Sequence, residues 1–79
     1  MKVSFKIDGE AITQNVETIY INDGMKRVVL HFSKDANLTK LLTFSFTYKL
    51  QFYKYADDGH VGITIPLDSI YSLEYDKED

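Results

Sequence analysis

The chain contains no cysteine, no tryptophan, one proline and four glycines among its 79 residues. Without cysteine, neither a disulfide nor a thiolate metal site can stiffen the fold, and no oxidising compartment is required. No stretch approaches the roughly 18 uninterrupted apolar residues of a membrane-spanning helix, and the first residues lack the apolar run of a signal peptide. We therefore expect a soluble protein that acts in the cytosol and has no membrane partner.

Positive charge is also scarce. Nine Lys and Arg residues stand against twelve Asp and Glu residues, which gives a formal net charge of −3. A protein that grips a nucleic-acid backbone normally carries a basic patch, whereas the basic residues here are dispersed along the chain. The charge therefore weighs against direct nucleic-acid binding.

Most of the chain alternates apolar and polar residues, which is typical of strands with one buried face. We predict strands over residues 2–7, 10–14, 16–21, 25–32, 41–55, 61–65 and 71–75. Asp8-Gly9 and Asn22-Asp23-Gly24 favour hairpins between them, because both central positions of the preferred hairpin turn need a positive φ. The pattern leaves open which face of residues 16–21 is buried.

The stretch over residues 41–55 alternates strictly from Leu42 to Tyr53, with Phe44 and Phe46 on one face. It predicts one long strand around which the other strands are organised. The small and polar residues 33–40 before it predict a loop, with one helical turn that Ser33 caps.

A single domain of residues 1–79, with a frayed tail over 75–79, is expected to be all-β. Six or seven strands of this length suit either a small, partly closed antiparallel barrel or a compact sandwich, with at most one short helical turn. Residues 67–70, after Pro66, fit a single 3₁₀ turn. The segment ITIPLDSIYSLEY, from Ile63 to Tyr75, resembles the closing segment of SH3-like, Sm-like and pleckstrin-like barrels. That resemblance implies a fold and no function.

Groups that could support catalysis are few. His31 and His60 are the only histidines, and no serine lies beside a base that could activate it. Asp57, Asp58 and His60 are close in sequence, but turn chemistry explains them, and the spaced ligands of calcium and zinc sites are absent. We expect a protein that is not an enzyme and needs no metal or cofactor.

Tyrosine is abundant, with six residues, and it readily serves exposed contact surfaces. We predict a partner-binding surface of tyrosines bordered by carboxylates: Tyr53, Tyr55, Asp57, Asp58, Tyr71, Glu74, Tyr75 and Asp76. Such a surface suits a protein partner with a basic face.

In its size, acidity, lack of cysteine and lack of catalytic residues, the chain resembles small phage-encoded inhibitors of host defence, such as anti-CRISPR proteins. The resemblance implies a compact domain in the host cytosol that blocks a nucleic-acid-binding site on a host-defence protein. The carboxylates that would then stand in for phosphates are Asp57, Asp58, Glu74 and Asp76.

Two other functions remain open. The edge of the long strand over residues 41–55 could pair with a second copy, which would make the protein a self-assembling β module such as a virion component. Lys49, Tyr53 and Tyr55 share a face of that strand, and Lys54 is adjacent. Aromatic residues interleaved with lysine are how oligonucleotide-binding barrels hold single strands, so a small oligonucleotide- or nucleotide-binding barrel is the other alternative.

Overall fold

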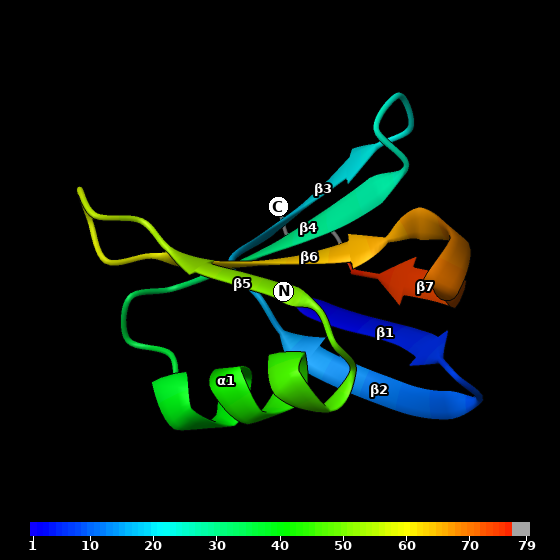
Figure 1. Ribbon diagram of the computed structural model, residues 1–79, viewed down its shortest axis with the longest axis horizontal. Helices are drawn as coiled ribbons and strands as arrows, with labels where there is room; N and C mark the ends of the chain where they lie inside the picture. The colour runs from blue at the N-terminus through cyan, green and yellow to red at the C-terminus, as the bar shows by residue number, and fades with distance from the viewer. Residues whose placement is uncertain (77–79) are drawn as a thin grey trace.

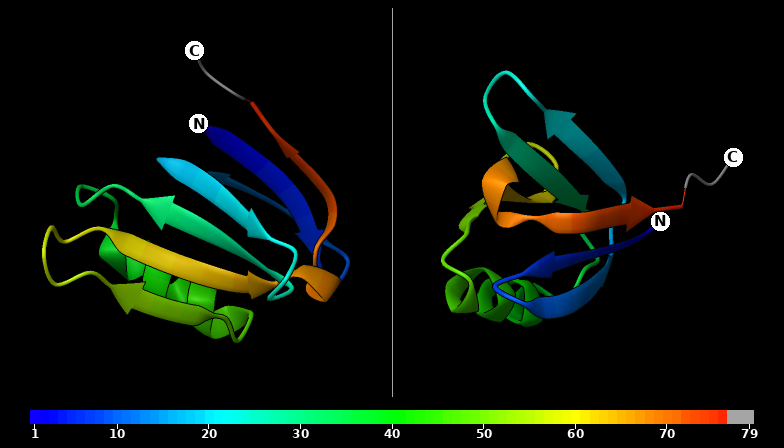
Figure 2. Two further views of the ribbon diagram at one scale, coloured as in Figure 1. Left: turned by 90° about the horizontal axis from the view of Figure 1, so that it is seen from above. Right: turned by 90° about the vertical axis from the view of Figure 1, so that its right-hand side faces the viewer.

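The computed structural model describes residues 1–76, and within them it contains seven strands, one α-helix and one 3₁₀ turn (Figure 1). The three-stranded sheet has the order β2-β1-β7, formed by Glu10–Asn15, Lys2–Ile7 and Tyr71–Tyr75. The four-stranded sheet has the order β3-β4-β6-β5, formed by Thr18–Asn22, Arg27–Phe32, Val61–Pro66 and Gln51–Lys54. The predicted all-β class and its strand number are confirmed, and the two antiparallel sheets are not closed into a barrel (Figure 2).

The first hairpin forms as its turn residues predict. Ile7 of β1 stands opposite Glu10 of β2, so the connection is a two-residue loop. Its residues Asp8 and Gly9 have φ angles of 51° and 80°. Positive φ at both positions is the geometry that lets a tight turn follow the right-handed twist of the strands. The 3₁₀ turn η1 (Leu67–Ser69) and the last strand are also where the sequence pattern places them.

The core lies between the two sheets and draws on the inner face of each. Apolar residues of β4 stand directly opposite those of β6, as in the pairs Leu30 with Ile63 and Val28 with Ile65. All four of these side chains are fully buried, and Phe5 of β1 packs into the same cluster. Burying a side chain of this kind stabilises the fold by roughly 1.5–3 kcal/mol.

The prediction of one long strand over residues 41–55 is wrong. Leu38–Thr47 forms the helix α1, and only Gln51–Lys54 forms a strand, β5. The helix has ten residues, whereas at most one helical turn was expected. The long edge that would have paired with a second copy is therefore absent from the described residues.

Local and tertiary interactions explain the helix. The side chain of Asn37 accepts a hydrogen bond from the backbone N–H of Lys40 at 3.1 Å and so caps the first turn. Ser33, the predicted cap, instead accepts a hydrogen bond from the backbone N–H of Asp35. The helix buries Leu41, Phe44 and Ser45, which share one helical face because their spacing follows the 3.6-residue period.

The helix ends in a Schellman motif, which satisfies two of its last carbonyl groups. The backbone N–H of Leu50 donates to Ser45 at 2.8 Å, and that of Lys49 donates to Phe46 at 3.2 Å. Lys49 occupies the position after the cap with a φ of 56°, where glycine is the usual residue. The chain thus turns sharply from α1 into β5, with the backbone of Lys49 in the left-handed conformation.

The helix closes the side of the core where β5 and β2 lie, each at the edge of its sheet (Figure 1). Tyr48, at its C-terminal end, donates a hydrogen bond to the carboxylate of Glu10 in β2. In the described residues no helix is long and apolar enough to span a membrane. Of the tail predicted to fray, Tyr75 ends β7 and Asp76 donates a backbone hydrogen bond to Lys2, while 77–79 lie outside the described residues.

The helix makes a prediction that separates it from a strand. Phe44 is 9% exposed and Phe46 is 87% exposed. We expect Phe44→Ala to lower the free energy of unfolding by about 3 kcal/mol or more, because it opens a cavity in the core. Phe46→Ala should change it by no more than about 0.5 kcal/mol. Urea unfolding measures both, and similar losses for the two variants would contradict the helix, since a strand would bury both rings on one face.

Candidate binding site on the outer face of the four-stranded sheet

The four-stranded sheet has one face in the core, and we call its other face the outer face. Figure 2 shows α1 behind β5 and β6 in its left view, so that the outer face is turned toward the viewer. The strand register places two rows of neighbours across it: Thr18, His31, Gly62 and Tyr53, and then Tyr20, Val29, Thr64 and Gln51. Ile19 and Ile21 of β3 stand opposite the buried Leu30 and Val28, which settles the face of this strand that turns inward.

Three rings form an aromatic cluster on this face: His31, Tyr53 and Tyr55. The rings of His31 and Tyr55 stack with centroids 5.5 Å apart and an interplanar angle of 2°. Tyr53 meets Tyr55 edge to face, with centroids 5.7 Å apart. Both geometries are favourable for aromatic pairs. Desolvation raises the pKa of the Tyr55 hydroxyl, and Tyr53 and Asp58 raise it further, so this phenol is neutral near neutral pH.

Gly62 makes the cluster possible. A Cβ atom at this position would lie 2.7 Å from Cε2 of Tyr53 and 3.2 Å from the hydroxyl of Tyr55. Only glycine lets the Tyr53 ring lie directly on the backbone of β6, as is common where a strand glycine is closely approached. The Tyr53 hydroxyl also forms a hydrogen bond with the hydroxyl of Thr64, two residues further along β6. The Tyr53 ring is therefore fixed both by its contact with the β6 backbone at Gly62 and by the hydrogen bond of its hydroxyl with Thr64.

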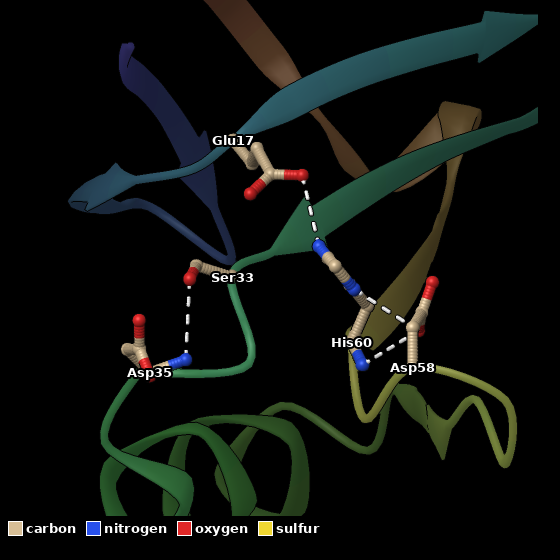
Figure 3. A network of polar contacts seen from close by, with 5 residues as sticks. All are labelled: Glu17, Ser33, Asp35, Asp58 and His60. Atoms are coloured by element: carbon tan, nitrogen blue, oxygen red, sulfur yellow. Dashed lines mark hydrogen bonds and ion pairs between the residues drawn. The ribbon is translucent and has the colours of Figure 1, made fainter.

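A carboxylate–histidine cluster, formed by Glu17, Asp58 and His60, lies beside the aromatic cluster (Figure 3). Nε2 of His60 is 3.1 Å from Glu17, and Nδ1 is 3.0 Å from Asp58. The backbone N–H of His60 also donates to Asp58, at 2.9 Å. Because the backbone N–H of Tyr55 donates to the carbonyl of His60 at 2.8 Å, the two clusters are adjacent.

The charges in this cluster reinforce one another. The contact with the Asp58 carboxylate raises the pKa of His60, and Glu17 raises it further, although partial burial acts against both. The hydrogen bond from the His60 backbone lowers the pKa of Asp58. When His60 is protonated, its ring lies between two carboxylates, as the opposed contacts in Figure 3 show.

Ser33 and the two carboxylates around His60 make separate contacts. Ser33 accepts a hydrogen bond from Asp35, and Figure 3 draws no bond between it and His60. Glu17 and Asp58 contact opposite nitrogens of the ring, so they do not converge on one point. Among residues 1–76, no group of three or more His, Cys, Asp or Glu side chains is placed to hold a metal ion.

The structure divides the predicted binding residues into two groups. Tyr53, Tyr55, Asp57 and Asp58 stay together on β5 and the hairpin that follows it. The other four lie on β7 or directly after it, in the other sheet: Tyr71, Glu74, Tyr75 and Asp76. Figure 2 places β5 and β7 on opposite sides of the molecule in its left view, so the eight residues do not form one patch.

Sequence reasoning missed three residues of the outer face: Glu17, His31 and Gly62. His31 was recognised only as a strand residue, because its stacking partner Tyr55 directly follows β5, a strand that does not pair with β4. One signal was available: a glycine between Val61 and Ile63 of a strand indicates a close approach by another group. The identity of that group depends on the register of β5 with β6.

The carboxylate–histidine cluster predicts a pH-dependent stability. The raised pKa of His60 means that its ion pairs stabilise the fold fully below the ordinary histidine pKa of about 6.5 and are lost as pH rises through the folded-state pKa. We therefore expect the stability advantage of the wild type over His60→Gln to shrink as pH rises from about 6.5 through the folded-state pKa of His60. Thermal unfolding at a series of pH values measures it.

An NMR titration of the His60 ring supplies the control. Asp58→Asn should lower the titration midpoint, because it removes the main cause of the raised pKa. Asp57→Asn removes a neighbouring charge and should leave the midpoint nearly unchanged. Equal effects of the two variants would show that general acidity of the hairpin, rather than the Asp58 contact, controls His60.

Comparison with protein-family models, with curated proteins and with solved structures finds no match for this chain. The function is therefore argued from the geometry of its own residues.

Proposed function

We propose that this protein is a non-catalytic binding protein that occupies a surface of a macromolecular partner through the outer face of its four-stranded sheet. The observation that carries the proposal is the stack of His31 on Tyr55, with Tyr53 packed against it. Tyr55 is 36% exposed although it takes part in this packing. Rings that are already ordered lose little side-chain entropy on binding, which favours affinity.

The charges beside the rings favour a protein partner with a basic face. Asp57 and Asp58 lie in the hairpin next to Tyr55, and Glu17 adds a third carboxylate at the same end of the sheet. Aromatic anchors with an acidic border are complementary to a surface rich in lysine and arginine. Such surfaces occur on proteins that handle nucleic acid.

The finer form of the proposal is an inhibitor of a nucleic-acid-binding host-defence protein, acting in the cytosol of a phage's host. Asp57 and Asp58 would there occupy positions that phosphates take in the nucleic acid. The supporting features are the acidic border, the exposed rings and the resemblance in size and composition to anti-CRISPR proteins. The second group lies on β7 or directly after it, in the other sheet, and of its residues Tyr75 lines a pocket together with Thr18 and Tyr20 of β3.

The proposal predicts that Tyr55→Ala weakens partner binding at least about tenfold, as expected when a central aromatic anchor is truncated. Charge reversal by Asp57→Lys should also weaken it, mainly through a slower association rate. A tagged wild-type protein and these variants are used to recover partners from host lysate. The affinity of the purified partner is then measured by calorimetry.

Tyr71→Ala is the matched control, since Tyr71 is 63% exposed and lies on β7 of the other sheet. It should bind like the wild type. A partner retained equally by Tyr55→Ala and lost in Tyr71→Ala would move the binding surface to β7. A homo-oligomer with no other partner would favour the self-assembling alternative and direct attention to the exposed side chains of α1, Leu38, Leu42 and Phe46.

A further inference from the structure

A separate pocket lies at the other end of the outer face from the carboxylate–histidine cluster. It has a volume of about 270 Å³ and is lined by Met25, Lys26, Arg27, Lys49, Leu50, Gln51, Thr64 and Pro66. The charged residues in this lining are all cations. In an acidic protein with nine basic residues, three of them converge here.

Two segments that are distant in sequence bring these cations together, since Lys26 and Arg27 are adjacent residues and Lys49 lies after α1. Arg27 begins β4 and stands opposite Pro66 at the end of β6. Lys26 precedes it in the turn after β3, and the backbone N–H of Leu67 donates to the carbonyl of Lys26 at 2.8 Å, which ties that turn to η1. Lys49 follows α1 and immediately precedes β5.

The backbone at both lysines is strained. Lys26 and Lys49 each have a backbone φ of 56°, a conformation that residues other than glycine rarely adopt. Glycine would relieve the strain at each position, yet both residues carry a cation that lines the same pocket. Strained residues of this kind are concentrated at functional sites, where the surrounding structure maintains them.

The cations also lack internal partners. Within residues 1–76, none of Lys26, Arg27 and Lys49 forms an ion pair, and the ion pairs found there involve His60. Like charges gathered at one pocket repel one another. An anion bound between them would attract each cation and so offset this repulsion.

The geometry points to a site for the phosphate group of a small organic ligand, and we propose that the pocket binds a phosphate monoester. A phosphate carries more charge than a carboxylate, and arginine and lysine recognise it through charge-assisted hydrogen bonds. Gln51 adds a polar side chain to the lining, while Met25, Leu50 and Pro66 add apolar surface for the organic part. The proposal does not rest on the proposed protein partner, because none of the three cations belongs to the aromatic cluster; Thr64 alone connects the two, through its hydrogen bond with the hydroxyl of Tyr53.

The test titrates the full chain with inorganic phosphate, ribose 5-phosphate, a mononucleotide and a 5′-phosphorylated oligonucleotide, followed by amide NMR shifts and calorimetry. We expect saturable binding of the phosphate monoesters at physiological ionic strength, with shifts at residues 25–27 and 49–51. Lys26→Gly and Lys49→Gly should each weaken binding at least about tenfold, since each removes a cation from the pocket. Comparing the affinities of the mononucleotide and ribose 5-phosphate shows whether the base contributes to binding.

These glycine variants exclude loss of folding as an explanation. Each should unfold at a higher urea concentration than the wild type, because glycine accepts a φ of 56° without strain. Ser72→Gly is the matched control: Ser72 also has a φ of 56°, but it lies in β7 of the other sheet and carries no charge. It should bind phosphate monoesters like the wild type.

Three results would overturn the proposal. The first is the absence of saturable binding by any of the phosphate compounds. The second is equal binding by the wild type and Lys49→Gly. The third is binding of the oligonucleotide without binding of the mononucleotide, which would assign the pocket to a nucleic-acid strand instead of a small ligand.

Discussion

The register between β4 and β6 is the constraint on which the rest of the structure depends. It sets Val28, Leu30 and Phe32 opposite Ile65, Ile63 and Val61, and all six side chains are almost completely buried. The same register sets His31 opposite Gly62 on the outer face. Because side chains alternate between the faces of a strand, a slip of one residue would move the core side chains to the outer face and the outer ones into the core. Burial of the inner set therefore also fixes the position of the outer one.

The helix is the second element on which both proposed sites depend. It completes the core through Leu41 and Phe44, on the side where the edges of the two sheets are not paired with each other. Its Schellman motif then turns the chain through Lys49 into β5. That turn delivers Lys49 to the basic pocket and, four and six residues later, Tyr53 and Tyr55 to the aromatic cluster. A packing requirement of the core thus determines where two sets of exposed side chains are placed.

Charge is distributed unevenly along the outer face. Glu17 and Asp58 contact His60 at one end, beside the aromatic cluster. Lys26, Arg27 and Lys49 line a pocket at the other end, together with Thr64 and Gln51. Net charge alone describes neither end, because a chain that is acidic overall still concentrates cations at one place. A single sheet can in this way carry carboxylates at one end and cations at the other.

The sequence by itself determined the elements whose signals are local. Alternation identified the two strands of the first hairpin, and Asp8-Gly9 identified its turn, because the conformational demands of a tight turn act on neighbouring residues. The all-β class, the 3₁₀ turn after Pro66 and the last strand followed in the same way. Of the eight residues predicted for the binding surface, Tyr53, Tyr55, Asp57 and Asp58 stay together in the structure, since they are close in the chain.

Only the tertiary structure decided the state of residues 38–47 and the composition of the sites. Leu42, Phe44 and Phe46 satisfy the period of a strand, while Leu41, Phe44 and Tyr48 satisfy that of a helix, so the pattern supports either state. The core selected the helix, because it needs Leu41 and Phe44 and leaves Phe46 in solvent. Likewise, the stacking of His31 on Tyr55 and the convergence of Lys26, Arg27 and Lys49 arise from pairing between distant segments. Local sequence does not predict such pairing, since the pairing is stabilised by burial that exists only once the sheets have formed.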